Sequence, residues 1–222
     1  YRRLVVQMLY DTPLPHRIAL ISGGTGTAKT DLLQHLKTAG AQVLDLEGLA
    51  QHRGSLFGAT GSAQPAQKMF ESRVAAALSP LDPARLTWVE AESSKIGARI
   101  IPPSVWSAMA SAPRIEISAP LSARAAYLCR AYTDLTADPV RLNKQIDHLR
   151  PFHAAALIER WHELALSGNW AALAEQLMQA HYDPRYQKSA SAAAAPMGQL
   201  PLPDLRDTTL ADAAAHLAQK FT

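Results

Sequence analysis

The strongest constraint on the fold is a glycine-rich segment between an apolar stretch and a helical pattern. The segment is Gly23-Gly24-Thr25-Gly26-Thr27-Ala28-Lys29-Thr30, with Ile18–Ile21 before it and Asp31–Leu36 after it. A strand, a glycine-rich turn and a helix in succession are typical of a loop whose backbone N–H groups and helix dipole converge on an oligophosphate. All residues from Gly23 to Thr30 are therefore predicted to bind phosphate. Lys29 adds a full positive charge, and the Thr30 hydroxyl is a candidate magnesium ligand.

The segment departs from the usual pattern at one position. That pattern is Gly, any four residues, Gly, Lys, then Ser or Thr, and Ala28 stands where the second glycine is expected. If the position needs a positive φ, the methyl group costs roughly 1–2 kcal/mol. A plain glycine-rich turn is the alternative interpretation, but Lys29 and Thr30 in register favour a phosphate ligand.

Composition sets broad limits. A chain of 222 residues with 48% hydrophobic residues suits one or two globular domains. No apolar run approaches the ~20 residues needed to span a bilayer, and no secretory signal precedes the first strand, so we expect a cytoplasmic protein without a membrane partner. The single cysteine, Cys129, excludes an intrachain disulfide and is predicted to be a buried, inert thiol.

Net charge permits a polyanionic partner without requiring one. The formal charge is +3 and the isoelectric point is about 9.1. Basic residues become more frequent in the second half, where solvated helix faces are the simpler explanation.

The order of elements predicts the fold class. Strands are expected near 17–22, 41–46, 85–90 and 114–119, with helices near 1–10, 29–39, 67–78 and 104–110, and a long loop over 47–64. Residues 122–181 are helical in pattern, with breaks expected near 138–139, 151 and 168–169. An alanine-, serine- and proline-rich linker is expected over 189–203, and a weak amphipathic helix over 208–221. This alternation predicts an α/β fold: a P-loop NTPase-like parallel sheet flanked by helices, with a helical C-terminal subdomain. The expected divisions are a connecting helix and linker at 1–15, the core at 16–120, the helical subdomain at 121–188, and a linker with a C-terminal helix at 189–222.

Acidic residues near the ends of predicted strands are candidate magnesium ligands. Glu90 ends the third strand and Glu92 follows it, so either could act with Thr30 on a magnesium ion. Asp45 and Glu47 follow the second strand and could face the same crevice. Arg53 could clamp a phosphate, and neighbouring His52 is better explained as polar surface.

Longer strings in the same region resemble a known family. Asp45–Gly58, Gln64-Pro65 with Gln67 and Phe70-Glu71, and Val89–Gly97 are similar to the tRNA 2-selenouridine synthase family. The resemblance is densest from Arg17 to about Pro113. Those proteins carry a phosphate loop where this chain has Gly23–Thr30, and Ala28 departs from their glycine.

The resemblance implies a two-step modification of 2-thiouridine at the wobble position of tRNA. Geranyl diphosphate would first geranylate the sulfur, and selenium from selenophosphate would then replace the geranylthio group. It implies catalytic roles for Lys29, Glu90 and Arg53, and magnesium at Thr30 with Glu90 or Glu92. Contacts to tRNA are expected from Arg53 and from the basic helical residues Arg141, Lys144 and Arg150.

Family members also have an N-terminal rhodanese-like domain with a reactive cysteine. Nothing in residues 1–222 resembles that domain, and Cys129 lies in the wrong context to replace its cysteine. The chain is therefore expected to be the C-terminal half of such an enzyme or a split homologue. Two other functions remain open: a P-loop nucleotide kinase or NTPase, and a non-catalytic tRNA-binding module.

Overall fold

A five-stranded parallel sheet forms the centre of the molecule. The computed structural model describes residues 1–192 and 195–221, and its strands lie in the order β2-β3-β1-β6-β7. A short antiparallel pair, β4 and β5, lies outside this sheet. The strands are β1 (Arg17–Gly23), β2 (Gln42–Leu44), β3 (Leu86–Glu90), β4 (Lys95–Ile96), β5 (Arg99–Ile100), β6 (Arg114–Ser118) and β7 (Gly198–Pro201).

Helices connect the strands and extend the chain beyond them. In the first half they are α1 (Arg2–Val6), a π-helical turn η1 (Gln7–Asp11), α2 (Lys29–Thr38), α3 (Leu46–Ala50), α4 (Gln67–Leu78) and α5 (Pro103–Ser111). In the second half they are α6 (Leu121–Ala131), α7 (Thr133–Thr136), α8 (Pro139–Asp147), η2 (Arg150–Phe152), α9 (Ala155–Leu166), α10 (Trp170–Leu177), η3 (Met178–Tyr182), α11 (Asp183–Ala192) and α12 (Asp207–Lys220).

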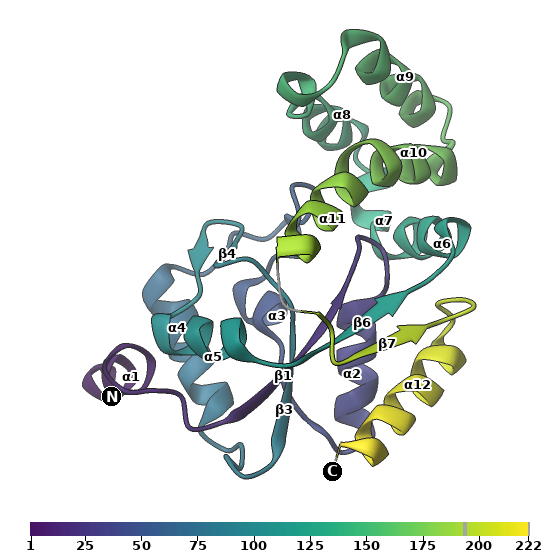
Figure 1. The fold of residues 1–222 in the computed structure, drawn as a ribbon. Coiled ribbons are helices and arrows are strands. Elements are labelled where there is room, and N and C mark those ends of the chain that lie inside the picture. The colour runs from purple at the N-terminus through teal and green to yellow at the C-terminus, as the bar shows by residue number, and fades with distance from the viewer. Residues whose placement is uncertain (193–194, 222) are drawn as a thin grey trace.

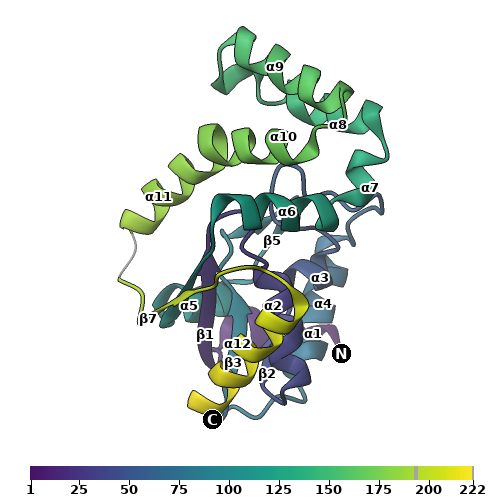
Figure 2. The same cartoon turned by 90° about the vertical axis from the view of Figure 1, so that its right-hand side faces the viewer.

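Two apolar layers cover the two faces of the sheet. Because side chains alternate along a strand, Ile18 of β1 packs with α4, α5 and η1, whereas Ala19 and Ile21 pack with α2 and α12. Figures 1 and 2 show α4 and α5 on one face and α2 and α12 on the other. The predicted fold class, a parallel sheet flanked by helices, is confirmed.

A helical arm, defined here as α7 to η3, projects beyond the carboxyl ends of the strands (Figures 1 and 2). Its own apolar core is centred on the fully buried Trp161 and Ile158. Phe57, from the loop after α3, joins this core and so anchors the arm to the sheet domain. The predicted helix breaks are confirmed: α8 begins at Pro139, and Asn169 caps α10 by accepting from Ala172 N.

Two predicted irregular segments contain regular structure. The first residues of the loop predicted over 47–64 belong to helix α3 instead. The Asp45 side chain accepts from Gly48 N, so Asp45 caps a helix that starts directly after β2. The linker predicted over 189–203 is wrong in part, since the end of α11 and strand β7 lie there. β7 pairs in parallel with β6 and adds a fifth strand to the sheet.

Length and hydropathy also limit what the helices can do. Within residues 1–192 and 195–221, none of them has the length and apolar character of a membrane span. The longest, α12, instead covers the sheet with Leu210, Ala214 and Leu217.

Candidate functional site

The loop Gly23–Thr30 leads from β1 into α2, as predicted. Gly23 is tightly enclosed: a Cβ there would lie 2.7 Å from both Ile117 O and Thr27 Oγ1. Ala28 has φ 58° and ψ 34°, the left-handed conformation that favours glycine. The position therefore requires the positive φ suspected from the sequence, and alanine adopts it with its methyl group buried against the apolar layer of α2.

The loop is held from outside by an arginine that the sequence did not single out as functional. The Arg124 guanidinium of α6 donates to Thr25 O from Nε at 2.8 Å and from Nη2 at 2.7 Å. The same group pairs with Asp183 at the start of α11, with 2.6 Å between Nη2 and Oδ1. Arg124 lies 99 residues from Thr25 along the chain, so no local pattern could have revealed the contact.

Lys29 lies within the loop and faces the neighbouring strand. Its Nζ donates to Gly23 O at 3.1 Å and lies 3.7 Å from Glu90 Oε1. The side chain is 15% exposed, so the charge is poorly solvated. A phosphate ligand in the loop would give this ammonium group a second anionic partner.

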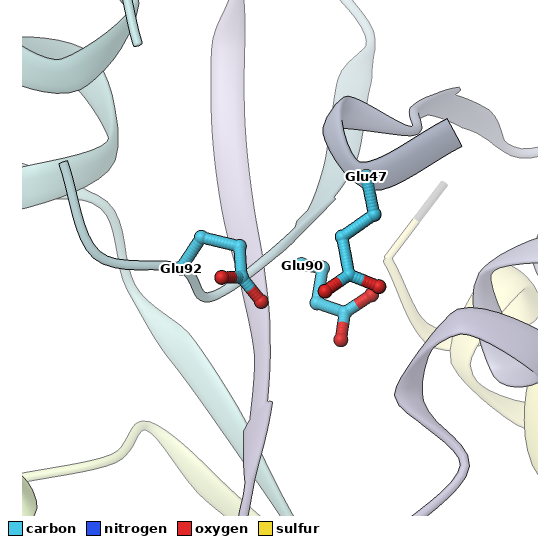
Figure 3. A group of neighbouring side chains, drawn as sticks. All are labelled: Glu47, Glu90 and Glu92. Atoms are coloured by element: carbon cyan, nitrogen blue, oxygen red, sulfur yellow. The ribbon is translucent and has the colours of Figure 1, made fainter. Parts of the chain in front are cut away.

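Three glutamates converge beside Lys29. Glu90 ends β3, Glu92 follows it, and Glu47 comes from α3, and one carboxylate oxygen of each lies within 4.8 Å of the others. Figure 3 shows the three carboxyl groups turned toward one another. Thr30 Oγ1 lies 3.0 Å from Glu90 Oε2 and 3.2 Å from Glu47 Oε2.

Burial raises the pKa of all three carboxyl groups, and repulsion from neighbouring glutamates adds to this at Glu47 and Glu92. Burial, with the charges of Glu90 and Glu92, raises the pKa of Glu47 to about 10. Burial and the charge of Glu90 raise the pKa of Glu92 to about 7. Burial also raises the pKa of Glu90, although Lys29 and Thr30 oppose that change. One lysine is thus too little positive charge for two buried carboxylates and a half-buried third.

These residues fit a magnesium ion. Carboxylate and hydroxyl oxygens are the hard ligands that magnesium prefers, and a divalent cation would relieve the repulsion among the glutamates. Thr30, Glu90 and Glu92 were predicted as ligands, and the structure brings them together. Glu47, noted in the sequence only as facing the same crevice, joins them.

A cavity of about 1320 Å³ opens in front of the loop and the glutamates. Arg53 lies in its wall, with its guanidinium 4.7 Å from the centre of the Tyr132 ring and Nη2 2.9 Å from Asp134 Oδ1. Arg53 Nη1 is buried without a hydrogen-bond partner among the described residues, so the side chain keeps a free donor. His52 lies outside the cavity lining, and burial and Arg53 lower its pKa.

The basic residues predicted to contact tRNA differ in their surroundings. Arg141 donates to Ala59 O and pairs with Asp134, and exposed Arg150 pairs with Asp147 and Glu159. Lys144, also exposed, forms no ion pair with another described residue. The prediction of tRNA contact stays open for all three, but two of them also tie the arm together.

Comparison with known proteins gives one consistent family. A family model described as the tRNA 2-selenouridine synthase AAA domain matches residues 16–155. The tRNA 2-selenouridine synthase of Chromohalobacter salexigens is 40% identical over 117 residues, which cover 53% of this chain and 31% of that protein. The synthase of Shewanella oneidensis is 31% identical over 180 residues, covering 80% of this chain and 42% of that protein.

Coverage of the relatives is partial. Another relative, the tRNA 2-selenouridine synthase of Psychromonas ingrahamii, is 32% identical over 142 residues, which cover 64% of this chain and 38% of that protein. The chain thus spans between about a third and two fifths of the length of the curated relatives it matches.

Proposed function

The chain belongs to the tRNA 2-selenouridine synthase family, and we propose that it is the phosphate-loop domain of a cytoplasmic transferase that modifies 2-thiouridine at the wobble position of tRNA. The observation that supports this most directly is the convergence of the loop Gly23–Thr30, Lys29 and the three glutamates on one large cavity. The geometry suits a substrate with a diphosphate group, because anion-binding and cation-binding groups lie side by side.

The first proposed step is geranyl transfer. The sulfur of 2-thiouridine attacks the first carbon of geranyl diphosphate, so a carbon–sulfur bond forms and the carbon–oxygen bond breaks. Diphosphate leaves with the electron pair, and the proton on N3 of the base goes to water. The loop N–H groups and Lys29 would stabilise the charge that develops on the leaving diphosphate.

Magnesium would assist the same departure. Thr30 with Glu90, Glu92 and Glu47 would hold the ion, which when bound neutralises diphosphate charge. Arg53 would donate a hydrogen bond from its free Nη1 to a phosphate oxygen of geranyl diphosphate or of the tRNA.

The second proposed step exchanges sulfur for selenium. The selenium of selenophosphate attacks C2 of the base, a carbon–selenium bond forms, and the geranyl thiol leaves. Water takes over the phosphoryl group, which is released as phosphate. We propose that a rhodanese-like domain and the tRNA are partners of this chain, with Arg53, Arg141, Lys144 and Arg150 contacting tRNA phosphates.

The test is direct. The chain is incubated with 2-thiouridine-containing tRNA, geranyl diphosphate and magnesium, and the digested nucleosides are analysed by mass spectrometry. A geranyl mass added to 2-thiouridine, absent from the Lys29→Ala variant, is the expected result. ATP or GTP turnover without geranylation would instead favour a nucleotide kinase or NTPase, which can use the same loop.

A third outcome concerns binding alone. If tRNA binds in the same sample, without added mass and with no effect of Lys29→Ala on any ligand, the chain is a non-catalytic tRNA-binding module. Repeating the reaction with a chain that includes the rhodanese-like domain then distinguishes this outcome from a requirement for the second domain.

A further inference from the structure

The cavity in front of the phosphate loop has two chemically different halves. One half contains the loop, Lys29 and the glutamates. The other half, called here the apolar chamber, lies beside the sheet face of β1 that α5 covers, and Met197, just before β7, also lines it. Its apolar lining consists of Leu20, Trp106, Met109, Ala110, Ala112 and Met197.

The chamber is built from rigid elements. Leu20 lies on the central strand β1 and is paired with Arg114 of β6. Met109 of α5 is 2% exposed and belongs to the core cluster on that face of the sheet. Ala110, the next residue, is exposed and lines the cavity with only a methyl group, so the helix leaves room there.

Two polar side chains at the rim of the chamber, Tyr186 and Ser22, already have partners, whereas Arg114 makes only one long contact. Tyr186 OH donates to Glu116 Oε1 at 2.8 Å, and Ser22 Oγ donates to Ile115 O at 3.2 Å. Arg114 Nη2 lies 3.5 Å from Ala190 O. Apart from the Arg114 guanidinium, a ligand group that needs hydrogen bonds, such as a nucleobase, would find few unsatisfied partners, whereas a hydrocarbon needs none.

We propose that the apolar chamber binds the hydrocarbon tail of a prenyl diphosphate whose diphosphate lies in the loop Gly23–Thr30. This inference rests on the proposed function and deepens it by assigning residues to the tail. Both halves belong to one continuous cavity of about 1320 Å³, so a single ligand can occupy them together. Ala110 is then a determinant of tail length, because a larger side chain there would shorten the chamber.

A second apolar cavity provides the competing location. It lies under α10, near Leu173, Leu177 and Met178, and also contacts Thr25 of the loop. Its volume is about 80 Å³. Since one water occupies about 30 Å³ of liquid, this space holds only a few waters and is small for a ten-carbon tail.

The experiment measures binding by titration calorimetry in the presence of magnesium. The ligands are inorganic diphosphate, dimethylallyl diphosphate and geranyl diphosphate. The variants are Ala110→Phe, Ala174→Phe in the second cavity, and Ala215→Phe as a matched control on the exposed side of α12. For the unmodified chain we expect geranyl diphosphate to bind at least about 10-fold more tightly than inorganic diphosphate, because the tail is buried.

Ala110→Phe should weaken geranyl diphosphate binding about 10-fold or more while leaving inorganic diphosphate unchanged. It should weaken the shorter dimethylallyl ligand less. Ala215→Phe should change nothing. Circular dichroism and the retained affinity for inorganic diphosphate confirm that each variant is folded.

Two results would overturn the inference without touching the proposed function. One is equal affinity for inorganic and geranyl diphosphate in the unmodified chain. The other is loss of tail-dependent affinity in Ala174→Phe but not in Ala110→Phe, which would place the tail under α10. If none of the diphosphates binds the unmodified chain, the proposed function itself fails.

Discussion

The phosphate-loop region and the helical arm use charged residues in opposite ways. Around the loop, two buried carboxyl groups and the half-buried Glu92 face one lysine, and the pKa values of all three carboxyl groups are raised. In the arm, Asp134 lies between Arg53 and Arg141, and Arg150 lies between Asp147 and Glu159. Negative charge is in excess at the loop, whereas Asp134 and Arg150 of the arm each lie between partners of opposite charge.

The difference shows where a ligand has most to contribute. Balanced surface pairs contribute about 0–1 kcal/mol and gain little from a further ion. Buried like charges are costly, so a cation that neutralises them contributes to stability as well as to chemistry. A basic residue in the arm is consequently weaker evidence for tRNA binding than Lys29 is for phosphate binding.

Removing the loop lysine tests this difference most strongly. Lys29→Ala should reduce diphosphate affinity about 100-fold or more, because a poorly solvated charge and its hydrogen bonds are lost. Affinity for tRNA should be largely unchanged. Lys144→Ala is the matched control in the arm: it should leave diphosphate binding unaltered and lower the salt dependence of tRNA binding by about one phosphate contact. Equal loss of both ligands in Lys29→Ala would contradict the division of roles.

The glutamates should make the chain less stable as pH rises when no divalent cation is bound. Glu92 has a pKa raised to about 7, so the folded state holds its proton more tightly than the unfolded state. The stabilising contribution of the protonated Glu92 is therefore complete below about pH 4.5 and is lost as pH rises through 7. The loss for this group corresponds to about 3 kcal/mol. Thermal unfolding with EDTA from pH 5 to 8 measures it.

Magnesium and a neutral variant provide the controls for that measurement. Magnesium should restore the melting temperature most strongly at pH 8, where the carboxylates are ionised. Glu92→Gln should reduce the loss between pH 4.5 and 7, whereas the loss that comes from Glu47, whose pKa is raised to about 10 mainly by burial, should remain. The same pH dependence in Glu92→Gln as in the unmodified chain would show that Glu92 is not the source of the loss, since the contribution of His181 is common to both chains.

The arm should respond to pH in the opposite direction. Burial, with the charges of Arg185 and His153, lowers the pKa of His181 to about 4. Its Nδ1 lies 2.9 Å from His153 Nε2, so protonating both rings is unfavourable. The unfolded state binds the proton more tightly, and stability is lost as pH falls from 6.5 toward 4. His181→Phe, which replaces the imidazole with an aromatic ring that cannot titrate, should reduce this acid-side loss in melting experiments. An identical acid profile in the variant would exclude His181 as its cause.

The smallest effect is expected at Ala28. Ala28→Gly relieves roughly 1–2 kcal/mol of left-handed strain but loses a buried methyl group and increases unfolded-state freedom, so the net change should stay within about 1 kcal/mol. Ala28→Val should cost more than about 2 kcal/mol, because a β-branched residue is disfavoured at this φ. Urea unfolding measures both. A neutral valine variant would mean that the loop readjusts its backbone.

Local patterns in the sequence determined the strand–loop–helix unit and the helix breaks. Strand β1, the loop and α2 follow directly from apolar residues, glycines and a helical pattern within 23 consecutive positions, residues 17–39. Pro139 and Asn169 mark helix starts for reasons contained in their own turns. The same local logic located Lys29, Thr30 and Glu90.

Only the tertiary structure decided which distant residues complete the site. Arg124 reaches Thr25, Glu47 joins Glu90 and Glu92, and β7 forms because the edge of β6 is available to it. The segment 189–203, which contains β7, is rich in alanine, serine and proline and so has little strand preference of its own. Leu200 and Leu202 gain burial only once the sheet exists. Propensity and capping act within a few residues, whereas pairing, burial and charge repulsion depend on neighbours that folding alone brings together.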